Sequence, residues 1–290
     1  MKSLNRILLE KLVAHRPSRA LRLSAERLGV DRITVRLSRH SALFRQGDAE
    51  TLELPLDRVI APWVLDHGCW QMEELDFVVA HAPRQPLILF DIGANVGLMT
   101  RQLMHALPGI VGAVCYEPHP LHFTVLARNL AHLQHCHLVQ AAAAAAAGQL
   151  SFYEDMHNSG NYSLNIDAMR GREYRTSIVE CVRAHDAEFL NRLSPETAQL
   201  PIIWKSDTQG FDEIIMTSLS DEFWSRVPVA VMEISRIKRP QFDAVRLSNI
   251  LELFPVRRFG NCPERLSVED VLQYAEGSDA LQKDLLLAKN

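Results

Sequence analysis

The stretch that decides the fold is Phe-Asp-Ile-Gly-Ala-Asn-Val-Gly, at residues 90–97. The run 87–90 is continuously apolar, which is typical of a strand buried on both faces of a parallel sheet. A helical pattern follows at about 96–106. Glycines at such a turn let the backbone approach a ligand closely, and the first N–H groups of the helix lack partners within it. The stretch therefore predicts a ligand-binding turn between a strand and a helix.

The same alternation continues along the chain. Further strands are predicted at 111–116, 137–140, 150–153, 201–204 and 229–234, and helices at 121–133 and after each of the last two strands. The alanine run 141–147 is too short to hold a helix alone, so we expect the end of a strand and a loop. Strands that alternate with helices indicate a parallel sheet with right-handed crossovers. We therefore predict an α/β fold with a doubly wound, mostly parallel sheet, and an antiparallel edge strand at 284–288.

Residues 1–83 follow a different pattern. They predict a helix at 4–28 that is interrupted near Pro17, short strands at 33–37 and 51–54 around a turn at 46–48, and helices at 57–66 and 71–82. Pro83 and Pro86 end this region. We therefore expect an N-terminal basic helical extension with a small cap region over residues 1–83, and a ligand-binding domain over residues 84–290.

Composition excludes several classes of protein. Hydrophobic residues make up 47% of the 290 residues and charged residues 23%, which is ordinary for a globular chain and excludes overall disorder. No stretch approaches the roughly 18 uninterrupted apolar residues of a membrane-spanning helix, and residues 1–22 are too rich in Lys and Arg for a secretory signal. The five cysteines lie far apart, and no His/Asp cluster has metal-ligand spacing. We expect no metal site, no disulfide framework and a cytoplasmic protein.

The net charge of −4 is unevenly distributed. Residues 1–40 carry ten Lys or Arg and three acidic residues, a net charge of +7, so the remainder carries −11. Two interpretations of this basic arm stay open: a solvated helical extension, or a segment that contacts an anionic membrane surface or a partner enzyme. Because the body of the protein is acidic, nucleic acid is not expected as a partner.

An acidic residue distinguishes the glycine-bearing turn from common nucleotide-binding fingerprints. Asp91 stands where a dinucleotide fingerprint has its first glycine, only Gly93 and Gly97 follow, and the Walker A pattern is absent. A carboxylate here would repel a pyrophosphate and would suit a cationic group such as a sulfonium. The turn therefore favours S-adenosylmethionine over NAD or ATP. The structural alternative for Asp91 is a helix N-cap.

Glu117 ends the next predicted strand, 26 residues after Asp91. A carboxylate at this place can accept hydrogen bonds from both hydroxyls of a ribose, as the acidic residue of dinucleotide-binding folds does. The alternative is a solvated strand end. Together, the two acids predict that one carboxylate contacts the amino-acid end of the donor and the other its sugar.

A third polar block follows the strand at 201–204. Lys205 and Asp207 are two residues apart, so they point to the same side of the strand. They predict a Lys–Asp pair that orients a substrate or tunes a base, the alternative being a structural ion pair that caps the next helix. Glu233 ends the following strand and adds a carboxylate to the same edge, where an acid is more often functional or paired than free.

These blocks resemble the FkbM family of S-adenosylmethionine-dependent methyltransferases. The similarity rests on the glycine-bearing turn, on Glu117-Pro118 with Asn129 downstream, on the blocks 205–211 and 231–234, and on the Gly-x-Trp segment at 68–73. It covers about residues 57–289 and implies a Rossmann-like class I methyltransferase fold for residues 84–290. It also implies methyl transfer to oxygen, usually a hydroxyl on a sugar, glycan or other small molecule.

Each polar side chain now has an expected role. The residues expected to bind the cofactor are Asp91, Gly93, Ala94, Asn95, Gly97, Glu117 and Pro118. A hydroxyl acceptor needs a base as its proton leaves. Asp207, held by Lys205, is the first candidate for that base, and Glu233 is the second. Histidines are further candidates because of their pKa, namely His119, His122 and His157, and the polar loop 158–161 is suited to covering a substrate.

Three residues depart from the family's pattern, namely Gln71, Ser206 and Asp212, and they leave the substrate pocket open. Two hypotheses from other classes also stay open. One is a Rossmann-like NAD-dependent oxidoreductase, against which the missing first glycine speaks. The other is a non-catalytic scaffold that retains the cofactor fold.

Overall fold

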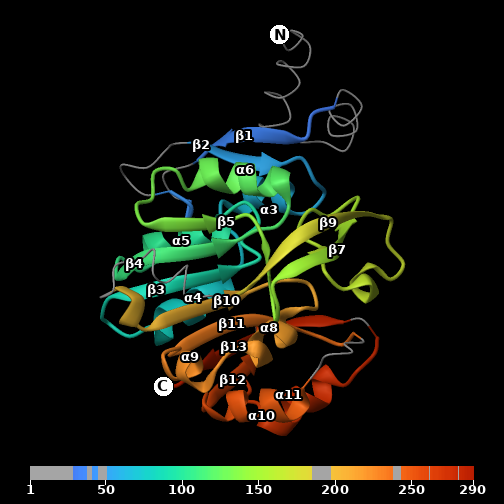
Figure 1. The fold of residues 1–290 in the computed structure, drawn as a ribbon. Helices are drawn as coiled ribbons and strands as arrows, with labels where there is room; N and C mark the ends of the chain where they lie inside the picture. Colours follow the sequence, from blue (N-terminus) through green and yellow to red (C-terminus); the bar gives the residue numbers. More distant parts are fainter. Residues whose placement is uncertain are drawn as a thin grey trace.

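The computed structural model describes residues 29–37, 41–44, 51–184, 197–237, 243–260, 262–279 and 281–290 (Figure 1). The helix predicted at 4–28, the turn predicted at 46–48 and most of the basic arm lie outside the described residues. In the described part of the chain, no helix is long and apolar enough to cross a membrane.

A sheet of seven strands forms the centre of the molecule (Figure 1). Its strands are, in order across the sheet, β12 (Val256–Phe259), β13 (Gln282–Ala288), β11 (Val229–Ser235), β10 (Ile202–Ser206), β3 (Leu87–Ile92), β4 (Ile110–Tyr116) and β5 (Cys136–Val139). Neighbours from β11 to β5 run parallel, and β13 is antiparallel to both strands beside it. The chain leaves β3 toward β4 on one side and later returns to β10 on the other, which creates a topological switch point. The predicted doubly wound, mostly parallel α/β fold is confirmed.

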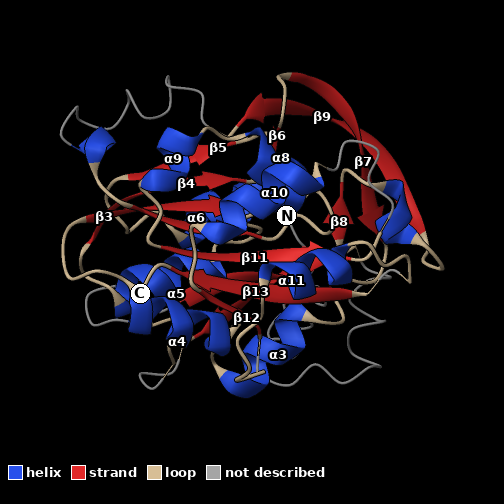
Figure 2. Cartoon of the chain, turned by 90° about the horizontal axis from the view of Figure 1, so that it is seen from below, coloured by secondary structure: helices blue, strands red, loops and turns tan. Residues whose placement is uncertain are grey.

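Side chains of the central strands pack alternately into two cores, one on each face of the sheet. In β3, Ile88 and Phe90 contribute to one core, and Leu87 and Leu89 to the other. Helices lie on both sides of the strands (Figure 2), and their bounds are α4 (Met72–His81), α5 (Leu98–Ala106), α6 (Pro120–Asn129), α8 (Asp212–Ser218), α9 (Asp221–Ser225), α10 (Ala244–Glu252) and α11 (Val268–Ala275). Because both faces are covered, these strands are continuously apolar in sequence.

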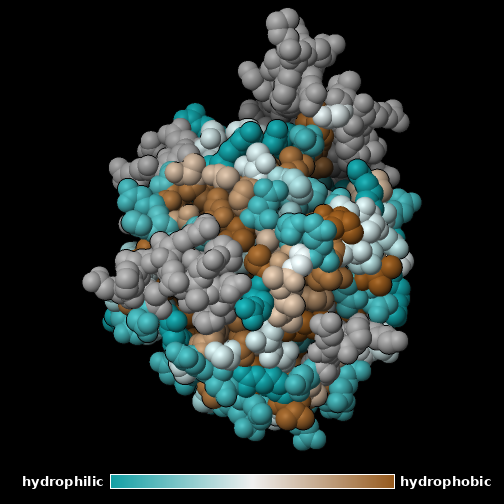
Figure 3. Space-filling model, viewed as in Figure 1, coloured by the Kyte–Doolittle hydropathy of each residue, from teal (hydrophilic) through white to brown (hydrophobic). Residues whose placement is uncertain are grey.

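Helix α10 buries one side only. In α10, Leu247, Ile250 and Leu251 are fully buried in the core, while Val245 is exposed. Figure 3 shows that the lower part of this face, over α10 and α11, is mainly hydrophilic, and that hydrophobic side chains gather toward the middle. Burial of one face against the sheet therefore holds α10 in place.

The antiparallel strand predicted at 284–288 is present as β13, but it lies one position in from the edge of the sheet. Leu285 and Leu287 pack into one core, and Leu286 and Ala288 into the other. Because both faces of β13 are buried, a hydrogen-bonded strand on each of its edges suits it best. The strand β12 is the neighbour on the outer edge. The sequence analysis missed β12 because its Val-Arg-Arg-Phe sequence lacks an apolar run.

A second, smaller sheet lies beside the central one (Figure 1). Its strands are, in order, β6 (Ala142–Ala144), β9 (Tyr174–Arg183), β7 (Gly148–Asp155) and β8 (Tyr162–Ser163). Part of the alanine run is therefore a short strand, where the end of the preceding strand and a loop were predicted. Small side chains fit there because Ala142 and Ala144 pack in a buried cluster with Phe152 and Val179.

The cap region consists of β1 (Arg32–Arg36), β2 (Thr51–Pro55) and α3 (Ile60–His67), and the first two form an antiparallel pair. The two strands match the predicted ones closely. Their apolar side chains share one core with Val96, Leu98 and Val125 of the larger part. Cap and body are thus packed together, and the division after residue 83 stays a prediction.

Candidate functional site

A pocket opens where β3, β4 and β10 end. Its empty space is about 840 Å³, counting the part open to solvent. Seven of the residues predicted for the site line it, namely Gly93, Ala94, Asn95, Glu117, Pro118, Lys205 and Asp207. Three others stand outside its lining, namely Asp91, Gly97 and Glu233. The pocket lies at the switch point, where open α/β sheets bind their ligands.

The two glycines of the turn serve different purposes. Gly93 has φ 70°, and a Cβ on it would lie 2.1 Å from the carbonyl oxygen of Asp207. Its missing side chain therefore lets the turn pass directly beside the end of β10. Gly97 has φ 84°, and a Cβ there would meet Leu126 of α6 at 2.8 Å. Gly97 therefore allows close packing against α6 and stands outside the pocket lining, and its predicted contact with the cofactor stays a prediction.

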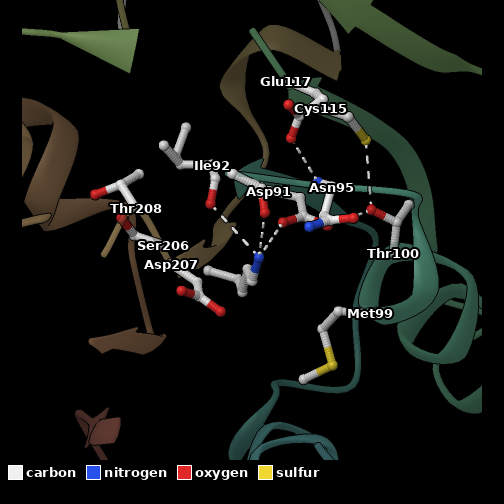
Figure 4. Close-up of polar contacts among 12 residues, drawn as sticks. Asp91, Ile92, Asn95, Met99, Thr100, Cys115, Glu117, Ser206, Asp207 and Thr208 are labelled. Atoms are coloured by element: carbon white, nitrogen blue, oxygen red, sulfur yellow. Dashed lines mark hydrogen bonds and ion pairs between the residues drawn. The ribbon is translucent and has the colours of Figure 1, made fainter. Parts of the chain in front are cut away.

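Asp91 stands outside the lining of the pocket, and its predicted contact with the donor stays a prediction. Its side chain is fully buried and lies 2.8 Å from the ammonium of Lys205 (Figure 4). Thr100 Oγ1 donates a further hydrogen bond to its second oxygen. Asp91 and Lys205 are direct neighbours in the register of β3 and β10, so their side chains meet on one face of the sheet.

Lys205 was predicted to pair with Asp207, and the structure places its ion pair on Asp91 instead. Its ammonium also donates to the carbonyl oxygen of Gly93, 2.9 Å away. Burial acts to lower the pKa of Lys205, but the carboxylates of Asp91 and Asp207 outweigh it and the pKa lies above its ordinary value. Lys205 therefore stays charged and fixes the glycine-bearing turn to the end of β10.

Glu117 has the position that was predicted for it. It lies at the carboxyl end of β4, and one of its oxygens accepts the backbone N–H of Asn95 at 2.9 Å (Figure 4). The other oxygen accepts the backbone N–H of His119 at 2.8 Å. Burial raises the pKa of Glu117 to about 7, although both hydrogen bonds oppose the shift. Each carboxylate oxygen can accept a second hydrogen bond, so the group is suited to bind a pair of hydroxyls.

Asp207 lines the pocket beside Gly93, at the end of β10. Its Oδ1 accepts a hydrogen bond from Gln209 Nε2 at 2.7 Å, and the same amide lies 3.1 Å from Glu233 Oε1. Burial and neighbouring acids raise the pKa of Glu233 well above its ordinary value. Glu233 lies outside the pocket lining and is joined to Asp207 through Gln209, and its role as second candidate for the base stays a prediction.

Two segments far apart in the chain, residues 57–60 and residues 159–160, meet at one wall of the pocket. Ser159 donates from Oγ to Asp57 at 2.6 Å, and its carbonyl oxygen accepts from the Asn95 amide at 2.9 Å. Ile60 of α3 and Gly160 line the pocket next to this contact. The prediction that the polar loop covers the site agrees with this arrangement. Its partner Asp57 was missed, since no local pattern marks a contact across 102 residues.

One of the three candidate histidines lines the pocket. His122 is buried and stacks on Tyr162, with ring centroids 4.9 Å apart. Burial lowers the pKa of His122 to about 3, so its ring is neutral. His157 instead pairs with Glu173 at 3.0 Å on the outside of the loop. The stacked pair gives the pocket an aromatic wall beside Pro118.

Comparison with known proteins gives likenesses in fold. No family model matches the chain, and no curated protein matches it. The FkbM methyltransferase from Methylobacillus flagellatus KT is 13% identical with a TM-score of 0.39, over 70% of this chain and 44% of that one. The N-terminal domain of human METTL16, in complex with SAH, is 10% identical with a TM-score of 0.38, over 82% and 75%. The 23S rRNA methyltransferase ErmE is 11% identical with a TM-score of 0.35, over 76% and 68%. This chain therefore spans less than half the length of the first of these structures.

Proposed function

We propose that the protein is an S-adenosylmethionine-dependent methyltransferase. The observation that carries the proposal is Glu117, a buried carboxylate in the pocket whose two oxygens are oriented by the backbone N–H groups of Asn95 and His119. It stands at the strand end next to the glycine-bearing turn, where a ribose diol can reach both oxygens. The sequence resemblance to the FkbM family points the same way.

The residues of the pocket fit such a donor. Gly93 lets the turn lie directly against the end of β10, and the buried Oδ1 of Asn95 has no hydrogen-bond partner among the residues that the structure describes. A buried polar atom without a partner at a pocket wall is commonly satisfied by a ligand. Glu117 would hold the ribose, and Asn95 would accept a hydrogen bond from the donor. When bound, the donor supplies an activated methyl group.

The acceptor that we propose is a hydroxyl on a sugar, glycan or other small molecule. Asp207 is the base: as the hydroxyl oxygen gains the methyl group, its proton passes to the Asp207 carboxylate. The proton neutralises the Asp207 carboxylate, which would balance the positive charge that a sulfonium donor gives up with its methyl group. An alcohol is a weak nucleophile at neutral pH and needs such a proton acceptor, while alignment of the two reactants supplies most of the remaining rate.

Titration calorimetry with S-adenosylhomocysteine tests the proposal directly. We expect micromolar binding to the wild type and loss of at least about tenfold in affinity in Glu117→Ala, because both ribose contacts are removed. NADH serves as the control ligand and is expected not to bind. Undiminished affinity in Glu117→Ala would remove the assigned role, and tight NADH binding would favour the oxidoreductase hypothesis.

A second assay identifies the acceptor. Tritiated S-adenosylmethionine is incubated with a panel of methyl glycosides, a hydroxylated small-molecule panel and total RNA. Transfer to a hydroxyl compound that Asp207→Asn abolishes, with S-adenosylhomocysteine binding retained, is the expected result. Transfer to RNA would overturn the proposed acceptor, and binding without transfer to any class would favour the scaffold hypothesis.

A further inference from the structure

Behind the pocket, one side-chain amide joins two carboxyl groups. Gln209 Nε2 is 2.7 Å from Asp207 Oδ1 and 3.1 Å from Glu233 Oε1. The amide nitrogen carries two N–H donors, so it can serve both acids at once. Asp207 lines the pocket, whereas Glu233 is 8% exposed and stands outside the lining. The Gln209 amide therefore directly connects Asp207, which lines the pocket, to Glu233, which lies outside the lining.

The backbone of Gln209 adopts a conformation that residues other than glycine rarely take. Its φ is 56°, which lies in the left-handed region and is unfavourable by roughly 1–2 kcal/mol for such a residue. The conformation is fixed from two sides. Ser163 Oγ donates to the Gln209 carbonyl oxygen at 2.8 Å, and a Cβ on the next residue, Gly210, would meet Ile237 at 2.0 Å. Strain of this kind persists only where the surroundings enforce it, and it gathers at functional sites.

The two acids are held to different degrees. Glu233 is bound at both oxygens, because Gln282 Nε2 lies 3.1 Å from Oε2 while Gln209 occupies Oε1. Asp207 is bound at Oδ1 only, and its Oδ2 has no hydrogen-bond partner in the part of the chain that the structure covers. Glu233 is thus the anchor, and the free oxygen of Asp207 is the one available to a ligand.

We propose that Gln209 is a positioning residue. Anchored on Glu233, its amide holds the Asp207 side chain in one rotamer and leaves Oδ2 free for the acceptor hydroxyl. The inference rests on the proposed function, in which Asp207 takes the proton. It also gives Glu233 a role that its distance from the pocket allows, since Glu233 acts through Gln209 and never touches the substrate.

The test measures the rotamer of Asp207. Three-bond couplings between Asp207 Cγ and the backbone nitrogen and carbonyl carbon report χ1 by NMR, on the full chain with saturating S-adenosylhomocysteine. One staggered rotamer gives limiting couplings, and exchange among rotamers gives intermediate ones. We expect limiting values in the wild type and intermediate values in Gln209→Met, which keeps the approximate shape but donates no hydrogen bond. A purely structural role for Gln209 would leave these couplings unchanged.

A matched control is available on the other side of Glu233. Gln282→Met also removes an amide donor from Glu233 but leaves the Gln209 amide in place, so the Asp207 couplings should stay at their wild-type limits. Limiting couplings in Gln209→Met, or equal averaging in Gln282→Met, would overturn the inference. If Gln209→Met does not fold, Gln209→Asn replaces it: Asn tolerates the left-handed backbone but is one methylene too short to reach both acids, so averaging is again expected.

Calorimetry separates this inference from the proposed function. The variants are expected to bind S-adenosylhomocysteine within about threefold of the wild type, a difference of less than about 0.7 kcal/mol. A wild type that does not bind it would contradict the proposed function alone. In that event the couplings of the ligand-free protein still decide whether Gln209 holds Asp207.

Discussion

At the scale of single residues, the charge in the glycine-bearing turn is balanced within the protein. Asp91 is fully buried, and Lys205 lies 2.8 Å away as its neighbour in the adjacent strand. Two charges taken out of water need each other, because each alone would be strongly unfavourable in the interior. The pair therefore joins β3 to β10 directly beneath the pocket.

Removal of one partner tests this account. Lys205→Met is expected to lower the free energy of unfolding by about 3–5 kcal/mol, because it leaves the Asp91 carboxylate buried without a counter-charge. Urea denaturation monitored by tryptophan fluorescence gives the value. The double variant Asp91→Asn/Lys205→Met is the control and should be more stable than Lys205→Met alone, since it contains no unpaired charge. A double variant that is less stable than the single one would contradict the expectation.

Glu117 provides a pH-dependent prediction. With a pKa of about 7 in the free protein, Glu117 is largely protonated below neutral pH, and its carboxylate is the form that accepts two hydroxyls. Affinity for S-adenosylhomocysteine should therefore increase as pH rises from 6 to 8, by up to about tenfold for each pH unit below the pKa. Calorimetry over this range measures the slope. Glu117→Gln should bind more weakly with little pH dependence, and a wild-type slope in that variant would refute the assignment.

The residues of the site differ in whether the sequence around each one is enough to predict its position and contacts. Glu117 could be predicted because its place at a strand end is set by the neighbouring sequence. The partner of Asp91 could not, because it depends on which strand lies next to β3, more than 100 residues later in the chain. Gln209 and Asp57 were missed for the same reason: their contacts join segments that only the tertiary fold brings together.

At the scale of elements, one asparagine makes three hydrogen bonds that connect the cap to the body. At the end of α6, Asn129 accepts a hydrogen bond from the Glu53 N–H at 2.8 Å and donates to the Glu53 carbonyl at 2.9 Å. It also donates to the carbonyl of Val96 at 2.8 Å, within the glycine-bearing turn. The Asn129 amide thus pairs with the backbone of β2 as a neighbouring strand would. It also connects the cap to the glycine-bearing turn, which shapes the pocket.

Asn129→Ala should therefore loosen the cap. The loss of three hydrogen bonds at a buried side chain is expected to lower the free energy of unfolding by about 2–4 kcal/mol. Hydrogen exchange should show faster exchange at the Glu53 amide before any global unfolding. Arg128→Ala is the matched control: Arg128 is the preceding residue and pairs with the Glu53 carboxylate at 3.0 Å, but its side chain is 51% exposed, so a change below about 1 kcal/mol is expected. Equal effects in the two variants would contradict this account.

Elements with strong local patterns were predicted well, and those shaped by tertiary packing were not. The buried strands β3, β4, β10 and β11 have continuous apolar sequences, and each lies where it was expected. The strand β12 contains two arginines, and it forms by pairing with the buried strand β13. Most of β9 is partly or fully exposed, and it exists as the partner of β7 and β6. The sequence alone does not supply those partners.

At the scale of the whole molecule, several buried carboxyl groups have raised pKa values. Burial raises the pKa of Asp284 to about 8 and that of Asp212 to about 6, and it raises the pKa of Glu233 well above the ordinary value. Asp284 and Glu233 are neighbours in the register of β13 and β11. The fold therefore holds protons at neutral pH that the unfolded chain would release, and its stability is linked to pH.

The sign of this linkage follows from which state binds more protons. Above pH 7 the unfolded carboxyls are ionised, while Asp284, Glu233 and part of the Glu117 population keep protons in the folded protein, so stability must fall as pH rises through the folded pKa values. His122, whose pKa is lowered to about 3, works in the opposite direction only below about pH 6.5. In urea denaturation of the ligand-free protein, the free energy of unfolding is expected to fall by at least about 2 kcal/mol between pH 7 and 9. Asp284→Asn removes one of the titrating groups and should flatten this decline, whereas a wild-type stability that is constant or rises over the same range would show that these acids are already ionised in the folded protein.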